Sequence, residues 1–208
     1  MKSDSQTRPY RQIARARAAA DTARRITASF LERMEHSWFD EIRLEDIAQD
    51  AGVTVQTVLR RFGSKEGLLA AGQAEIEQNI MQGREVAVGD VAGALDVLIA
   101  EYETLGGLVI RLLAQEDRYA PIKATTDLGR AHHRKWVETT FSPWLDRIAG
   151  PARTHMLDRL VIAMDIYVWK LLRIDMRRGR KEVRQCMFEM CAEALGVDPE
   201  SLESAGIT

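Results

Sequence analysis

Three side chains with strong hydrogen-bonding groups, Gln56, Arg60 and Arg61, lie within six residues of one another. An amide and two guanidinium groups are suited to contact base edges and phosphates of DNA. Val58 and Phe62 are four residues apart, which predicts a helix with an apolar face turned to a core and these polar groups turned outward. The pattern therefore predicts a helix that reads DNA, although an ordinary helical hairpin with a solvated polar face shows the same pattern.

A second short helix and a tight turn should hold this helix in place. Four apolar residues recur at the spacing of one helix face: Leu44, Ile47, Ala48 and Ala51. Gly52 follows them, where a left-handed residue commonly ends a helix at little cost to glycine. Thr54 can cap the next helix with its hydroxyl group. Two helices joined in this way form a helix-turn-helix, whose second helix is a DNA-reading element.

The composition indicates a soluble globular protein of one or two domains. The chain has 208 residues, of which 46% are hydrophobic and 29% charged. The net charge of −2 does not favour nucleic acid. However, residues 1–33 contain eight basic and only three acidic residues, which suits phosphate contact. A basic solvated tail would have the same composition.

Several functional classes are not expected. No apolar run resembles a signal peptide or reaches the length needed to cross a bilayer, so we expect a cytoplasmic protein without a membrane partner. Cys186 and Cys191 lack the C-x-x-C spacing of redox or zinc sites. None of the four histidines follows a glutamate at the Glu-x-x-His spacing, and no phosphate-binding or nucleophile motif occurs. We therefore expect no metal, no cofactor and no catalytic residues.

The surrounding elements divide the chain into three parts. We predict a flexible basic arm over residues 1–14, a helix-turn-helix domain over 15–70, and a larger helical domain over 71–208. A helix from about Arg15 should precede the motif, and Ser64 can cap the helix that follows it. No alternating strand pattern occurs, so the predicted fold is all-α. Gly106 and Gly107 are predicted to kink or divide a long helix, and residues 117–127 to form a connection or a broken helix.

The last two predicted helices, over residues 154–178 and 181–195, have more apolar surface than one partner needs. Such a surplus can form half of a symmetric interface with a second copy of the chain. A well-covered core of a single chain is the alternative. The residues predicted to form the dimer interface are Leu157, Leu160, Met164, Val168, Val183, Met187 and Met190.

Residues from about Ile26 to Leu69 resemble the DNA-binding domain of tetracycline-repressor-type (TetR) transcriptional regulators. The matching residues are Ile47, Ala48, Ala51, Gly52, Val53, Thr54, Thr57, Phe62, Ser64, Lys65, Glu66, Leu68 and Leu69. The resemblance implies an N-terminal three-helix domain with a helix-turn-helix, followed by a larger helical domain that binds an effector and dimerises.

The resemblance also assigns roles to single residues. Positions that usually contact phosphates are occupied by Thr54, Thr57 and Lys65. Positions that usually meet base edges are occupied by Val55, Gln56 and Arg60. The chain departs from the family pattern at Leu59, where an aromatic residue is common, and at Arg43, where a threonine commonly caps the helix. Arg43 can contact a phosphate instead.

TetR-like regulators usually enclose a pocket for a small molecule in the helical domain. The candidate lining residues are Tyr102, Arg111, Gln115, Trp136, Trp144 and Tyr167, although each of them can equally be part of an ordinary core. The implied function is a repressor that a small-molecule effector releases from a palindromic DNA operator. A helix-turn-helix regulator that is controlled by a protein partner, or that has no ligand, remains the alternative.

Overall fold

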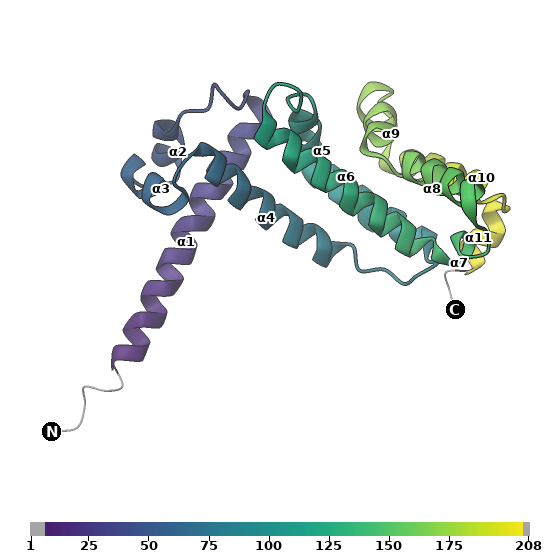
Figure 1. Ribbon diagram of the computed structural model, residues 1–208, viewed down its shortest axis with the longest axis horizontal. Helices are drawn as coiled ribbons and strands as arrows, with labels where there is room; N and C mark the ends of the chain where they lie inside the picture. Colours follow the sequence, from purple (N-terminus) through teal and green to yellow (C-terminus); the bar gives the residue numbers. More distant parts are fainter. Residues whose placement is uncertain (1–6, 206–208) are drawn as a thin grey trace. The chain divides into compact units, whose positions relative to one another are not determined.

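The computed structural model describes residues 7–205, and their regular elements are all helices, which confirms the predicted all-α fold (Figure 1). The chain divides into two compact units, Met1–Ile76 and Glu77–Thr208. Helix α4 (Lys65–Gly83) crosses the division between them. Within the described residues, no helix is long and apolar enough to span a membrane.

The first unit is built from α1 (Thr7–His36), α2 (Leu44–Asp50), α3 (Val55–Phe62) and the first part of α4. Helix α2 packs against both α1 and α3 (Figure 1). Apolar side chains from all of these helices and from the α1–α2 connection are buried: Ile26, Phe30, Met34, Phe39, Ile42, Ile47, Ala48, Ala51, Val58, Leu68 and Leu69. Arg33 also joins α1 to α2, with its guanidinium 2.6 Å from the Asp50 carboxylate.

Helix α1 begins at Thr7, so residues 7–14 of the predicted arm over residues 1–14 are helical. Residues 1–6 lie outside the described part. The segment after Pro9 is rich in Ala and Arg, which are strong helix formers, and it contains no glycine. Proline is tolerated in the first turn because the N–H group that it lacks has no helical partner there. The side chains of residues 12–20 are exposed, so propensity alone accounts for this part of the helix.

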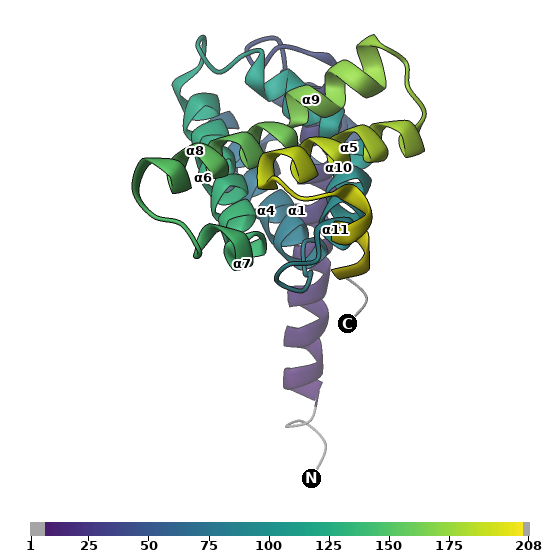
Figure 2. The ribbon, with the colours of Figure 1, turned by 90° about the vertical axis from the view of Figure 1, so that its right-hand side faces the viewer.

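The second unit contains α5 (Val91–Leu113), α6 (Ala120–Thr140), α7 (Ser142–Leu145), α8 (Gly150–Ala163), α9 (Ile166–Lys170), the π-helix η1 (Leu171–Asp175), α10 (Arg180–Leu195) and α11 (Pro199–Ala205). Helix α10 packs against both α8 and α5 (Figure 2). Large side chains from these helices and from α6 and α7 fill one core; Leu98, Phe141, Leu160 and Phe188 are among those fully buried.

The glycine pair in α5 does not divide the helix, which is continuous from Val91 to Leu113. A Cβ atom placed at Gly106 would lie 2.6 Å from the ring of Trp169, whereas one at Gly107 would meet no atom within 4 Å. Gly106 therefore provides the space in which Trp169 of α9 packs. The helix predicted over residues 154–178 is in fact interrupted after α8, where the Asp165 carboxylate caps α9 by accepting the Tyr167 N–H at 2.8 Å.

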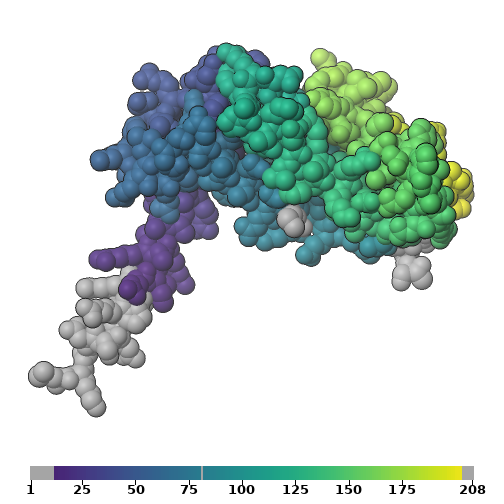
Figure 3. All heavy atoms as spheres, in the orientation of Figure 1, coloured from purple at the N-terminus to yellow at the C-terminus, as the bar shows by residue number. Residues whose placement is uncertain are grey.

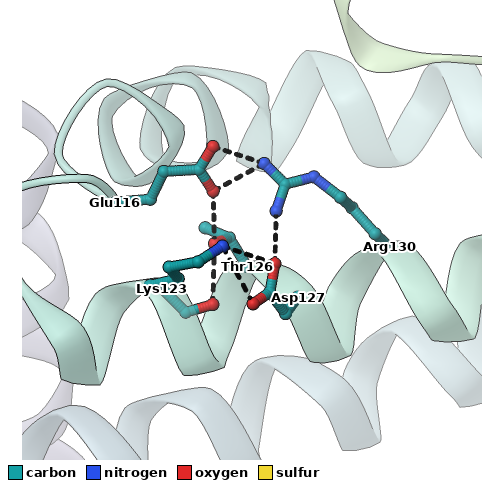
Figure 4. A network of polar contacts seen from close by, with 5 residues as sticks. All are labelled: Glu116, Lys123, Thr126, Asp127 and Arg130. Atoms are coloured by element: carbon teal, nitrogen blue, oxygen red, sulfur yellow. Dashed lines mark hydrogen bonds and ion pairs between the residues drawn. The ribbon is translucent and has the colours of Figure 1, made fainter.

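The segment between α5 and α6 is held by a network of polar contacts (Figure 4). The Glu116 carboxylate accepts hydrogen bonds from Arg130 at 2.5 Å and from the Thr126 hydroxyl at 2.6 Å. Arg130 also donates to Asp127 at 2.9 Å. These donors lower the pKa of Glu116, with the Arg130 hydrogen bond as the largest cause. The network fixes the first half of α6, which begins at Ala120, so much of the predicted 117–127 connection is helical.

Candidate nucleic-acid interface

The turn between α2 and α3 has the geometry of a helix-turn-helix. Gly52 adopts a left-handed backbone conformation with φ of +65°, and the Val53 N–H donates to the Ala48 carbonyl at 2.9 Å. The Thr54 hydroxyl caps α3 by accepting the Thr57 N–H at 3.2 Å, as predicted. The Thr54 and Thr57 hydroxyls are 3.0 Å apart. Both threonines therefore fix the start of α3, and Thr54 remains exposed there.

Helix α3 turns a polar face outward. Val58 is only 1% exposed, whereas Gln56 and Arg60, two residues before and after it, are both exposed. Two residues correspond to about 200° of rotation, so Gln56 and Arg60 share the side opposite the buried valine. Arg61 and Leu59 are also exposed, and Val55 is half-buried. Residues of α2 and α3, blue in Figure 3, form an outer face of the first unit.

The charges around α3 are suited to an anionic partner. The first turn of α3 holds no acidic residue, so no carboxylate offsets the partial positive charge at this helix end. Arg43, at the start of α2, makes no capping hydrogen bond and is exposed. Its guanidinium lies 3.6 Å from Glu45 in an exposed ion pair, which contributes little energy and can be exchanged for a phosphate contact.

Lys65 makes contacts within the chain that its position in the sequence does not predict. Its ammonium group donates to the backbone carbonyls of Phe39 at 2.5 Å and Ile42 at 2.9 Å, with Asp40 at 3.4 Å. It also lies 4.7 Å from the centre of the Phe39 ring. An ammonium has three N–H donors, and here each has a carbonyl acceptor. Lys65 thus ties the start of α4 to the α1–α2 connection, and a phosphate contact would require one of these bonds to break.

The residues next to Lys65 form the joint between α3 and α4. The Ser64 hydroxyl accepts the Gly67 N–H at 3.2 Å, which confirms Ser64 as the cap of α4. The Ser64 hydroxyl and the Glu66 N–H both lower the pKa of the Glu66 carboxyl group. A Cβ atom at Gly67 would lie 2.0 Å from the Phe62 carbonyl oxygen, so only glycine allows this approach.

Two of the six residues predicted to line an effector pocket lie near Arg84, which directly follows α4. The Trp136 indole donates to the Arg84 carbonyl at 3.1 Å, and the Arg84 guanidinium lies 4.8 Å from the Trp136 ring centre. Tyr102 is buried, and its hydroxyl donates to the Met164 carbonyl at 3.0 Å. Burial raises the pKa of Tyr102, while the charge of Arg84 acts in the opposite direction. Arg84 was not among the residues predicted from the sequence.

The other four predicted pocket residues occupy different places in the second unit. Gln115 is fully buried after α5, and its amide donates to the Arg111 carbonyl at 3.0 Å. Trp144 of α7 packs against Phe141, with ring centres 6.1 Å apart. Tyr167 is 53% exposed, and Trp169 contacts the Tyr102 ring instead. Gln115 is thus part of the ordinary core, which was the alternative to a pocket position.

The predicted dimer interface requires a correction. Five of its seven residues are buried within the single chain: Leu157, Leu160, Met164, Val183 and Met187. These side chains are not available to a second copy, because α8 and α10 pack against each other and α5 packs against α10. Val168 and Met190 are half-buried. The large apolar side chains that are exposed in this region are Ile162, Tyr167, Leu171, Ile174 and Met176.

Comparisons with known proteins agree with this geometry. Residues 39–71 match the family model of the bacterial regulatory proteins of the tetR family. A tetR-family transcriptional regulator from Streptomyces coelicolor has 15% identity and a TM-score of 0.64, covering 89% of this chain and 90% of its own. A putative TetR-family transcriptional regulator from Mesorhizobium loti has 18% identity and a TM-score of 0.59, covering 86% and 96%. No curated protein matched the chain. The helix-turn-helix thus lies within the stretch that matches this family model, and the two solved regulators share the all-α fold of this chain.

Proposed function

We propose that this protein is a cytoplasmic repressor that binds a palindromic DNA operator as a homodimer and is released by a small-molecule effector. The observation that carries the proposal is the outward face of α3, where Gln56 and Arg60 lie together opposite the buried Val58. A glutamine amide can pair with adenine and an arginine guanidinium with guanine in the major groove. Thr54, Thr57, Arg43 and Arg61 are proposed to contact phosphates at the edges of the same surface.

A homodimer accounts for features of the second unit. The side chains of Ile162, Leu171 and Ile174 are each more than half exposed. A second copy of the chain can cover such apolar side chains. Val168 and Met190, half-buried in the single chain, can complete the interface. Two-fold symmetry would present two α3 helices to adjacent half-sites, so the operator should be a palindrome.

The proposed effector acts by a shift of population between two arrangements of the dimer. In one arrangement the two α3 helices fit adjacent major grooves, and in the other they do not. A ligand that binds more tightly to the second arrangement lowers the affinity for DNA, to the extent that its own affinities for the two arrangements differ. While bound, the dimer covers its operator and blocks access to it, so we propose repression. Tyr102 and Trp136 are the predicted pocket residues with the strongest support, because both lie near buried Arg84.

Selection of bound sequences from random double-stranded DNA tests the proposal. We expect the full-length protein to enrich a palindrome. Gln56→Ala and Arg60→Ala should each relax the preference at one base position in each half-site by about 1–3 kcal/mol. Gln78→Ala and Arg147→Ala, which remove the same exposed groups from the second unit, should leave the selected sequence unchanged.

The possible results separate the alternatives. An enriched sequence that is not a palindrome would contradict the proposed homodimer. No enrichment at all would contradict the proposed binding to an operator. A regulator that is controlled by a protein partner, or that has no ligand, would bind the palindrome and would stay bound to it in the presence of every small molecule. Loss of enrichment on addition of a small molecule would support effector control.

A further inference from the structure

A buried group of polar side chains in the second unit combines residues from three consecutive segments. The Arg84 guanidinium forms a bidentate ion pair with Glu101 of α5, with N–O distances of 2.6 and 2.7 Å. The two side chains are only 10% and 12% exposed. Trp136 of α6 covers the guanidinium and binds the Arg84 carbonyl. Every charge in this group is therefore matched by a close partner.

His133 of α6 completes the group and has a defined protonation state. Its Nδ1 atom lies 3.2 Å from Nη1 of Arg84. A guanidinium N–H can only donate, so Nδ1 must be the acceptor and the ring proton must lie on Nε2. Burial, together with the neighbouring Arg84 charge, lowers the pKa of His133 to about 3. The imidazole is thus neutral at physiological pH.

The Nε2–H group of His133 is buried, and among the described residues it has no hydrogen-bond acceptor. A buried donor without an acceptor is unfavourable and rare in folded proteins. The neighbouring side chains cannot accept this bond, because the Arg84 guanidinium and the Trp136 indole offer only N–H donors and the Glu101 carboxylate is paired with Arg84. The chain therefore fixes a single N–H donor beside an aromatic ring, with the His133 and Trp136 ring centres 6.2 Å apart.

The charge balance indicates which kind of acceptor fits. Arg84 and Glu101 neutralise each other, and neutral His133 adds no charge. A buried carboxylate would have no free cation in this group to compensate it, and its desolvation would oppose binding. A neutral oxygen such as a ketone, ester or amide carbonyl can accept the Nε2–H bond without that cost. The aromatic ring and the adjoining apolar core favour an apolar body on the same molecule.

We propose that His133 is the polar anchor of a binding site for neutral, largely apolar carbonyl compounds, which accept a hydrogen bond from its Nε2–H. The proposal rests on the effector-controlled function above, since it assigns a chemical class to the effector. Arg84 and Glu101 act as positioning residues, because they hold the His133 ring in the tautomer that donates.

Phenyl alkyl ketones from acetophenone to hexanophenone can test the proposal, with alkylbenzenes of the same length and the matching phenylalkanoates as controls. Binding to the full-length protein without DNA is followed by tryptophan fluorescence. The histidine side-chain ¹⁵N resonances report on Nε2 directly. We expect at least one ketone to bind about tenfold more tightly than its hydrocarbon and its carboxylate, and to shift the His133 Nε2 resonance.

Two variants separate the hydrogen bond from packing. His133→Phe keeps a ring but removes the donor, and it should abolish the ketone preference. His133→Gln keeps an N–H group near the same position, and it should retain much of that preference. Circular dichroism checks that both variants are folded. Equal binding of ketones and hydrocarbons by the wild type, or an unchanged ketone preference in His133→Phe, would overturn the site.

The outcome is separable from that of the proposed function. Ketone binding that depends on His133 but leaves operator affinity unchanged would keep the site and remove the effector role. Operator binding that is normal while no ketone is preferred over its hydrocarbon would overturn this site only.

Discussion

The outer face of α3 and the Arg84 group use the same chemical groups in opposite ways. Arg60 and Arg61 are exposed on a helix without an acidic residue, so their hydrogen-bonding capacity is available to another molecule. Arg84 is nearly as buried as the core. Its guanidinium donates hydrogen bonds to Glu101 and His133 and lies over the Trp136 ring. The difference teaches that a guanidinium stabilises the fold or recognises a partner according to which acceptors the chain itself provides.

The largest expected effect concerns the interior. Arg84→Met should lower the free energy of unfolding by about 3–5 kcal/mol, because Glu101 would remain buried without its cation. Denaturant unfolding followed by tryptophan fluorescence measures this change. Arg147→Met, at an exposed position, is the matched control and should change stability by less than about 0.5 kcal/mol. Equal effects of the two substitutions would show that the buried ion pair of Arg84 contributes no more to stability than an exposed arginine.

Lys65 lies between the two cases and sharpens the comparison. Lys65→Met should destabilise the first unit by about 1–3 kcal/mol, because the carbonyls of Phe39 and Ile42 lose a charged donor. Binding to random DNA should keep the same dependence on salt once measured well below the unfolding temperature. A phosphate contact would instead lower the salt slope by about one. Such a decrease would show that Lys65 leaves its carbonyls when DNA is bound.

The protonation of His133 gives an effect that depends on pH. Its pKa is about 3 in the folded protein and has an ordinary value of 6.5. Between these values the unfolded chain binds a proton that the folded protein does not, so stability falls as the pH is lowered through this window. The slope should be up to about 1.4 kcal/mol per pH unit. His133→Gln, which cannot titrate, should show a correspondingly flatter profile in chemical unfolding measured across the window.

The smallest expected effect is at the outer face of α3. Arg60→Ala and Gln56→Ala should each change the free energy of unfolding by no more than about 0.5 kcal/mol, because both side chains are exposed and no buried partner loses its bond. The same two variants should lose sequence preference in the DNA selection. A large loss of stability would mean that this face is structural, as in an ordinary helical hairpin.

The parts of the site that the sequence predicted correctly depend on neighbours in the chain. Thr54 and Ser64 cap α3 and α4 as expected, since capping bonds reach only three residues ahead. Gly52 is left-handed at the predicted turn for the same local reason. The all-α fold and the helix-turn-helix could be predicted because each follows from periodicity and a few turn residues.

Several differences from the sequence predictions involve partners that are distant in the chain. Lys65 reaches carbonyls more than twenty positions earlier, and backbone acceptors leave no trace in a side-chain pattern. The apolar stripe that includes Leu160 is covered by the chain's own helices, whereas a surplus face and a covered face have the same sequence periodicity. The packing of Trp169 against Gly106 could not be predicted from the sequence, because the two residues belong to different helices.

The close approach at Gly67 has a mechanical consequence. Backbone meets backbone there without an intervening side chain, since even a methyl group would collide with the Phe62 carbonyl oxygen. Side chains can absorb small displacements by changing rotamer, whereas two touching backbones cannot. The first turn of α4 and the last turn of α3 should therefore move as one rigid body. A change in the tilt of either helix end would change the tilt of the other by the same amount.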